Sequence, residues 1–288
     1  MNKIEFGDCR ETMRRWAQEG IKAQTCVTSP PYYGLRDYGH EGQIGLEETP
    51  EQYIANMVEV FRCVRDVLAD DGTLWINIGD SYSVQHVGRR DHGTGAPTSR
   101  LGPNKDGLPG GTEIKATGNR LVPGLKPKDL IGIPWMLAFA LRADGWYLRQ
   151  DIIWHKPNPM PESVQDRCTK AHEYIFLLSK SQKYYYDIES IQEPAIYAGD
   201  DRGSRGDSRR GTEANSMSGK TGEFRNKRSV WTVTTKPYEG AHFAVFPQDL
   251  IEPCIMAGAP VGGVVLDPFM GSGTTAQVAQ NLGRKYLG

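Results

Sequence analysis

Residues 264–275 read VVLDPFMGSGTT, a short apolar run followed by an acid, a proline and a glycine-rich turn. A strand, a glycine turn and a following helix cradle nucleotide-like cofactors in many α/β proteins. The glycines let the backbone approach the ligand, and the helix N-terminus supplies unpaired N–H groups. A P-loop would need lysine after the second glycine, where this chain has Thr274. The stretch therefore predicts a cofactor turn and disfavours ATP or GTP hydrolysis.

A second motif near the N-terminus reads Ser29-Pro30-Pro31-Tyr32 and follows the β-rich run 25–28. Prolines cannot continue a central strand, so Ser29 is expected where a buried strand opens onto a loop. Alone, such a tetrapeptide would indicate only a proline-rich strand end or a polyproline ligand. Its position after a strand, in a chain that also carries the glycine turn, favours a functional role.

The pattern between the two motifs alternates strands with helices. Apolar spacing predicts helices over 50–68, 130–143, 247–257 and 274–282, and strands over 25–28, 73–78, 147–154, 174–178 and 264–266. Pro253 is expected to kink or shorten its helix. The alternation predicts an α/β fold, doubly wound around a mostly parallel sheet, with 147–154 and 174–178 as an antiparallel strand pair.

The composition is that of a globular protein rather than a disordered, secreted or membrane-spanning chain. With 288 residues, 38% hydrophobic and 24% charged, one large domain over 1–288 fits best. No 18-residue apolar run and no signal-peptide pattern occur, so we expect a cytoplasmic protein without membrane association. Five cysteines without a CxxC pair argue against zinc and against a disulfide framework, and we expect no metal.

The basic residues are concentrated in two stretches, although the formal net charge is only −1. Residues 86–128 carry eight basic and three acidic side chains, and residues 199–229 carry eight basic and five acidic ones. Nucleic-acid phosphates require clustered Lys and Arg, so any DNA-binding face must be local. Both stretches are also rich in small polar residues, and solvated loops without a partner remain the alternative.

Together, the two motifs resemble those of the amino-methyltransferases that alkylate exocyclic nitrogens of DNA bases with S-adenosylmethionine. In that family Asp-Pro-Phe-x-Gly-x-Gly belongs to the cofactor site, and Ser-Pro-Pro-Tyr or Asp-Pro-Pro-Tyr to the catalytic site. The catalytic motif comes first here, which is similar to the permuted β-type order of the family. The resemblance implies a Rossmann-like methyltransferase sheet, S-adenosyl-L-methionine as cofactor and double-stranded DNA as partner, and leaves a homodimer open.

The resemblance also implies roles for individual residues. Catalysis falls to Ser29, Pro30, Pro31 and Tyr32, and cofactor binding to Asp8, Cys9, His242, Phe243, Phe246, Asp267, Pro268, Phe269, Gly271, Ser272, Gly273 and Thr274. Asp8 is expected near the adenine amino group and Asp267 near the cationic end of the cofactor. Segments 152–162 and 172–180 resemble those that line the base pocket, with Tyr33, Trp154, Lys156 and Asn158 as candidate contacts.

Target recognition in β-type members corresponds to residues 187–237 here, and 86–128 forms a basic loop insertion. Arg202, Arg205, Arg209 and Arg210 are the candidate contacts to phosphates or guanines. The family normally has a carboxylate after the next strand, which receives the ribose hydroxyls. This sequence ends at Lys285-Tyr286-Leu287-Gly288 without one, so we expect weaker cofactor binding unless another group replaces it.

An exocyclic base amine is a poor nucleophile because its lone pair is delocalised into the ring. The Ser29 hydroxyl and the Pro30 carbonyl can accept its two N–H bonds, while Tyr32 stacks on a flipped-out base. Serine at the head of the motif favours cytosine N4 in this family, and adenine N6 is the alternative. A DNA-binding member without turnover, and less so an RNA or protein-amide methyltransferase, remain rival interpretations. Cytosine C5 chemistry would need a thiolate, and Cys254 lies in an apolar helical segment.

Overall fold

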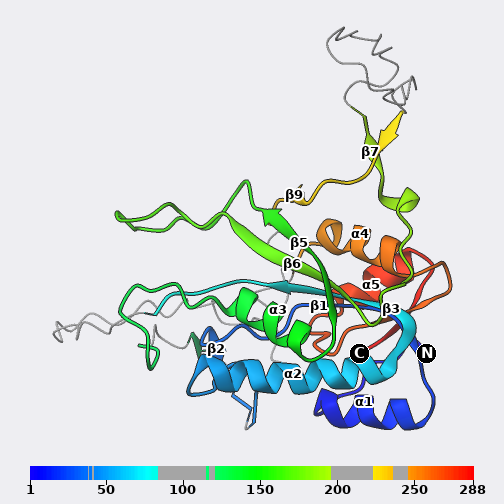
Figure 1. Ribbon diagram of the computed structural model, residues 1–288, viewed down its shortest axis with the longest axis horizontal. Coiled ribbons are helices and arrows are strands. Elements are labelled where there is room, and N and C mark those ends of the chain that lie inside the picture. The colour runs from blue at the N-terminus through cyan, green and yellow to red at the C-terminus, as the bar shows by residue number, and fades with distance from the viewer. Residues whose placement is uncertain (38, 41, 84–114, 117–120, 196–222, 236–245) are drawn as a thin grey trace, which may run out of the picture.

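Among the described residues, seven strands form the central sheet (Figure 1). The computed structural model describes every residue except 38, 41, 84–114, 117–120, 196–222 and 236–245. The order across the sheet is β11-β10-β1-β3-β6-β5-β9. In chain order these strands are β1 (Ala23–Thr28), β3 (Leu68–Ile78), β5 (Tyr147–His155), β6 (His172–Ser179), β9 (Val230–Thr232), β10 (Val264–Leu266) and β11 (Lys285–Leu287).

Most neighbouring strands of the sheet run parallel. β1 is parallel to β10 and to β3, β10 is parallel to β11, and β5 is parallel to β9. Strand β6 is reversed, because it pairs antiparallel with both β3 and β5. The structure thus confirms the mostly parallel sheet and the predicted antiparallel pair. The loops that follow β10, β1, β3 and β5 therefore gather at one edge, together with the start of β6, and this edge is where ligands bind in open α/β sheets.

Helices cover both faces of the sheet (Figure 1). α1 (Cys9–Gln18), α2 (Pro50–Val67) and α3 (Ile133–Ala143) lie on one face, and α4 (Gln248–Gly258) and α5 (Thr274–Asn281) lie on the other. Leu74 and Trp75, adjacent in β3, are buried in the two different cores that result. Side chains alternate along a strand, so a sheet covered on both faces needs apolar residues at successive positions.

Capping side chains mark the starts of α1 and α2, and the sequence prediction missed one of the five helices that the structure describes. Thr49 and Gln52 form a capping box at the start of α2, as expected from the sequence. Helix α1 was not predicted; the Asp8 side chain caps it, and its own Met13 and Trp16 are buried. Helix α4 confirms the predicted range 247–257, and Pro253 does not shorten it, since the helix continues to Gly258 with its buried side chains packed in the second core.

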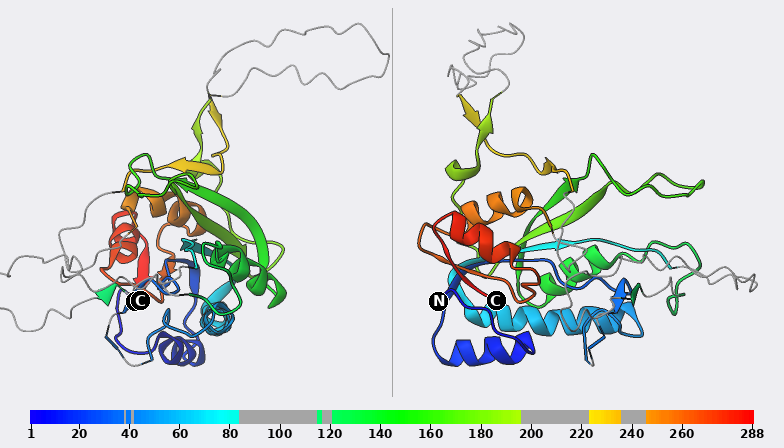
Figure 2. Two further views of the ribbon diagram at one scale, coloured as in Figure 1. Left: turned by 90° about the vertical axis from the view of Figure 1, so that its left-hand side faces the viewer. Right: turned by 180° about the vertical axis from the view of Figure 1, so that it is seen from behind.

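Smaller elements extend from this body. They are β2 (Arg36–Asp37) paired with β4 (Lys115–Ala116), the 3-10 turn η1 (Glu189–Ile191), and β7 (Glu193–Pro194) paired with β8 (Phe224–Arg225). The β7–β8 ribbon projects away from the sheet in all three views (Figures 1 and 2). In the described part of the chain, no helix has both the length and the apolar character needed to cross a membrane.

Candidate active site

The two sequence motifs meet at the carboxyl edge of the sheet. β1 and β10 are direct neighbours, with Thr25 opposite Val265 and Cys26 opposite Leu266. The Thr28 hydroxyl donates a hydrogen bond of 2.6 Å to Oδ1 of Asp267, although the two residues are 239 positions apart in the chain. The tetrapeptide Ser29-Pro30-Pro31-Tyr32 therefore begins one residue after a direct contact with the glycine-turn motif.

Asp267 is the buried centre of this junction. Its side chain is 1% exposed, and its carboxylate accepts hydrogen bonds from Thr28, from the Thr275 hydroxyl at 2.6 Å and from the Phe269 backbone N–H at 3.0 Å. Thr275 lies in the first turn of α5, so Asp267 links β1, its own turn and that helix. The sequence predicts this carboxylate near the cationic end of the cofactor, whereas in the structure its oxygens bind the chain itself.

Replacement of Asp267 with asparagine is expected to stabilise the cofactor-free protein at neutral pH. Burial raises the pKa of Asp267 from 3.8 to about 6, and the three hydrogen bonds offset this only in part. The folded state therefore favours the protonated carboxyl. The contribution of Asp267 to the free energy of unfolding is fully present below about pH 4 and is lost as the pH rises through 6. Asparagine stays neutral, so unfolding at pH 7 should cost up to about 3 kcal/mol more than in the wild type.

Urea unfolding of both proteins at pH 4.0 and pH 7.0 measures this effect. The difference between variant and wild type should be small at the lower pH and large at the higher one. An equal difference at both values would show that the ionisation of Asp267 does not contribute.

The glycine turn leaves open space at the N-terminus of α5. Gly273, with φ of 85°, is the residue before the helix, and no side chain caps the helix there. A Cβ built on Gly273 would have no atom within 4 Å, and one on Gly271 would meet only the Phe269 carbonyl, at 3.7 Å. The first N–H groups of a helix have no intrahelical partner and suit a carboxylate. The turn therefore fits the amino-acid part of S-adenosylmethionine, and Ser272 and Thr274, whose hydroxyls lie 3.2 Å apart, flank it.

The other predicted cofactor residues lie in three different settings. Asp8 caps α1 and pairs with Arg10, which lowers the pKa of its carboxyl, so in the structure it acts as a helix cap. Cys9 packs against the core, and burial raises the pKa of its thiol to about 12. Phe246 packs against the core beneath α4, while His242 and Phe243 lie outside the described residues.

The Ser29–Tyr32 loop is held in place by a side chain of helix α2. The Tyr53 hydroxyl, from α2, donates to the Pro31 carbonyl at 2.8 Å. Pro30 is buried, and no donor among the described residues reaches its carbonyl oxygen. The Pro30 carbonyl and the half-buried Ser29 hydroxyl are thus the two acceptors that this loop can offer to a ligand.

A polar network that the sequence does not reveal lies behind Tyr32. The Tyr32 hydroxyl donates to Glu173 Oε2 at 2.7 Å, and Asn77 Nδ2 donates to the same oxygen at 3.2 Å. Lys156 forms an ion pair with the other carboxylate oxygen of Glu173. A Cβ on Gly79 would lie 2.8 Å from the Tyr32 ring, so glycine is required at that position. Glu173 stands in a stretch assigned to the base pocket, but nothing in the sequence indicated its partner.

Two predicted contacts to the base are buried in the structure. Tyr33 is 5% exposed, its ring lies 5.7 Å from that of Tyr53, and its hydroxyl donates to the Glu48 carbonyl, so it belongs to the core. Trp154 is 4% exposed and donates to the Val233 carbonyl at 2.8 Å, so it cannot stack on a base. The Trp154 side chain points inward because side chains alternate along β5, where Ile152 and Trp154 are both buried.

Asn158 also has a structural role in this arrangement. Its amide exchanges two hydrogen bonds with the backbone of Thr235, at 3.1 Å and 3.0 Å. These two hydrogen bonds join the loop that follows β5 to the segment that follows β9. Among the four predicted base contacts, Lys156 is linked to Tyr32 through their shared partner Glu173, and its ammonium lies 4.2 Å from the centre of the Trp154 ring.

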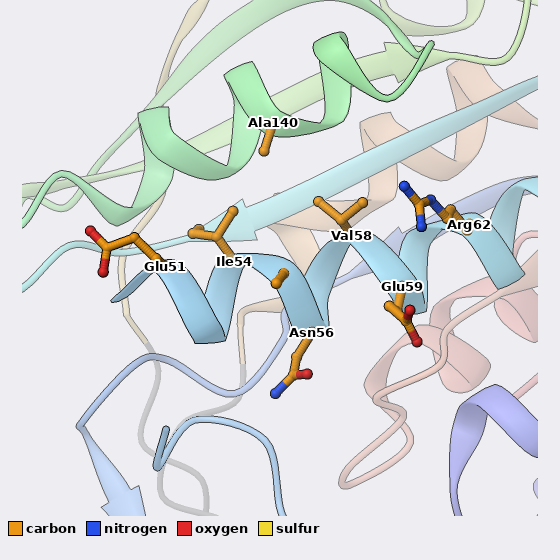
Figure 3. Close-up of a pocket in the computed structure, with 8 residues that line it drawn as sticks. Glu51, Ile54, Asn56, Val58, Glu59, Arg62 and Ala140 are labelled. Carbon is orange, nitrogen blue, oxygen red and sulfur yellow. The ribbon is translucent and has the colours of Figure 1, made fainter. Parts of the chain in front are cut away.

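A separate hollow of about 430 Å³ lies between α2 and α3 (Figure 3). Ile54 and Val58 of α2 line it together with Ala140 of α3, and Glu51, Glu59 and Arg62 surround it. Arg62 is already paired with Asp144. None of the motif residues contributes to this hollow, so it is not part of the site at the sheet edge.

Comparisons with known proteins agree with this geometry. A family model described as DNA methylase matches residues 23–288. The chain is 50% identical over 289 residues to the type II methyltransferase M.SmaI from Serratia marcescens, covering 99% of this chain and 85% of that protein.

Two solved structures share the fold. The cytosine-N4-specific PvuII DNA methyltransferase matches with a TM-score of 0.60 at 16% identity, over 99% of this chain and 80% of that one. A putative DNA modification methylase from Thermus thermophilus, solved with S-adenosyl-L-methionine, matches with a TM-score of 0.56 at 23% identity, over 100% and 87%. The chain therefore belongs to the DNA methylase family of amino-methyltransferases, whose cofactor is S-adenosylmethionine.

Proposed function

We propose that the protein transfers a methyl group from S-adenosylmethionine to N4 of a cytosine that is flipped out of double-stranded DNA. The observation that carries this proposal is the contact between Thr28 and Asp267, which brings the catalytic loop next to the cofactor turn. S-adenosylmethionine supplies a methyl group already activated on a sulfonium, so the chain mainly has to position the reactants.

Within this proposal, the Ser29 hydroxyl and the Pro30 carbonyl accept the two N–H bonds of the amine. That arrangement directs the nitrogen lone pair toward the cofactor side of the loop, where the glycine turn begins. Tyr32 is half-buried, whereas the neighbouring Tyr33 is buried in the core. Of these two rings, that of Tyr32 is therefore the one available to contact the base. Unstacking a base costs a few kcal/mol, and an aromatic contact returns about 1–3 kcal/mol.

Cytosine N4 is favoured over adenine N6 by the serine at the head of the motif, and adenine remains the second candidate. Site-specific modification is supported by the similarity to type II methyltransferases. We further propose that the 187–237 region reads the target sequence. Its described part contains η1, the projecting β7–β8 ribbon and strand β9 of the central sheet (Figure 1). Arg225 of β8 and Arg228 both pair with Glu193 of β7. Arg202, Arg205, Arg209 and Arg210, and most of the 86–128 loop, lie outside the described residues.

Nucleoside mass spectrometry of DNA from cells that express the chain tests this proposal. N4-methylcytosine should appear with the wild type and be absent with an empty vector. N6-methyladenine in its place would assign the other base, and neither product at high expression would favour the interpretation as a DNA-binding member without turnover. Mapping the modified positions by sequencing would then give the recognition sequence.

A further inference from the structure

A long loop joins β5 to β6 at the edge of the sheet that carries the site. It covers residues 156–171, all within the described part of the chain, and forms no helix or strand. The loop projects beyond the ends of both strands in Figure 1 and in the right-hand view of Figure 2. Loops of this length without secondary structure are uncommon in compact domains and usually have a function. The contacts of Lys156 and Asn158 account only for its first residues.

Both ends of the loop are fastened close to Tyr32. Lys156, its first residue, pairs with Glu173, which also accepts a hydrogen bond of 2.7 Å from the Tyr32 hydroxyl. Near the other end, the Lys170 ammonium donates at 2.6 Å to the carbonyl of Asp80, two residues after β3. A duplex that delivers a base to Tyr32 therefore has this loop alongside it.

Polar contacts brace the loop from inside. Glu162 accepts from the Arg167 guanidinium at 2.6 Å and from the Lys170 backbone N–H at 3.2 Å, which joins the two halves of the loop. The Arg167 guanidinium also lies 4.2 Å from the centre of the Tyr82 ring, on the segment that follows β3. The two hydrogen bonds of Asn158 fasten the first half to the segment after β9. The loop is thus held in a defined shape.

Met160 presents an apolar side chain to solvent from this braced loop. It is 85% exposed and stands between Pro159 and Pro161. Proline has a fixed φ and restricts the residue before it to extended conformations, so this stretch of backbone is stiff. Neither proline has an N–H group that could tie the stretch to the rest of the protein. The structure therefore holds an apolar side chain out in water beside the site, where a ligand with an apolar interior would cover it.

We propose that Met160 is a wedge that enters the base stack of duplex DNA and fills the gap left by the flipped target base. The inference rests on the proposed function, because a gap of this kind arises only when a base leaves the duplex. Methionine and proline are among the side chains that proteins insert between base steps. Extruding a base breaks its stacking, and the flexible, polarisable thioether restores contacts to the bases on either side.

Met160→Ala is expected to lower the single-turnover rate of methylation of a mapped duplex by about 10- to 100-fold, since the variant no longer offsets the lost stacking. The loss should shrink to less than about threefold on a duplex whose target cytosine faces an abasic site, because that base is already unpaired. The thermal midpoint and the affinity for S-adenosylmethionine should stay as in the wild type, since the side chain is exposed. Equal losses on the two duplexes, or a wild-type rate on the matched one, would overturn the proposal.

Two further variants serve as controls for the wedge. Met160→Leu keeps an apolar side chain of similar length and should retain most of the wild-type rate. Val261→Ala shortens another exposed apolar side chain, which is 75% exposed and lies in the turn before β10, at the edge of the sheet opposite the site. It should match the wild type on both duplexes. A loss for Val261→Ala as large as that for Met160→Ala would show that exposed apolar residues act without regard to position.

Oxidation footprinting tests the wedge without turnover. Dilute hydrogen peroxide converts exposed methionine to its sulfoxide, and peptide mass spectrometry measures the oxidised fraction at each position. A duplex selected for binding from a randomised pool should slow the oxidation of Met160 several-fold. Oxidation of Met1, which is 57% exposed and lies at the far end of the molecule from the loop, should not change (Figure 1).

The footprint and the methylation assay together separate the two proposals. Methylated DNA with equal oxidation of Met160 in the presence and absence of duplex would overturn the wedge and leave the proposed function standing. Protection of Met160 without any methyl transfer would overturn the proposed function and support the wedge in a DNA-binding protein without turnover. A chain that selects no duplex from the pool would overturn both.

Discussion

Replacing Ser29 with alanine is expected to lower kcat for methyl transfer by about 100- to 1,000-fold, with little change in the affinity for S-adenosylmethionine. The variant removes one of the two acceptors that hold the amine, and loss of one positioned hydrogen-bonding group in an active site typically has an effect of this size. The cofactor turn should be unaffected, because Asp267 contacts Thr28 and not Ser29. Single-turnover methylation of mapped duplex DNA and calorimetric titration of the cofactor measure the two quantities.

Ser179→Ala is the matched control for this prediction. Ser179 ends β6 at the opposite edge of the sheet, is fully buried, and donates to the Ser181 carbonyl at 2.9 Å. Its loss should cost about 1 kcal/mol of stability and leave the single-turnover rate as in the wild type. Equal rates for both serine variants would remove Ser29 from the catalytic step.

Phe61→Ala is expected to destabilise the protein by about 3–5 kcal/mol, the largest stability effect among our predictions. Phe61 lies on the inner face of α2, is 0% exposed, and belongs to the core between that helix, α1, α3 and the sheet. Alanine leaves a cavity that this well-packed layer cannot close. Urea or thermal unfolding measured on the two purified proteins gives the difference directly.

Phe139→Ala is the control, because it makes the same substitution at an exposed position. Phe139 belongs to the neighbouring helix α3 but is 47% exposed, with Trp135 5.5 Å from its ring and the Arg142 guanidinium 4.8 Å away. Since much of its surface already faces solvent, its removal should cost about 1 kcal/mol or less. A loss at Phe61 as small as that at Phe139 would contradict the described packing of this core.

Most elements of the fold, and the identity of the family, can be predicted from contiguous residues. The apolar spacing of 50–68 and the Thr49 to Gln52 capping signals are local, and the structure confirms α2 as Pro50–Val67. The glycine turn and the Ser-Pro-Pro-Tyr tetrapeptide are each recognisable within a few positions. Local patterns report local physics, because capping, helix periodicity and turn conformation depend on near neighbours in the chain.

Which of these side chains face the site could be learned only from the folded chain. Tyr32 and Tyr33 are adjacent and identical in type, yet one points toward Glu173 and the other into the core. Glu173 contributes to the site because it accepts a hydrogen bond from Tyr32, 141 positions away in the chain. Asp8 and Asn158, both predicted to contact a ligand, instead hydrogen-bond to the backbone of the protein. A side chain's role depends on partners that strand pairing brings together, and no local pattern in the chain records those partners.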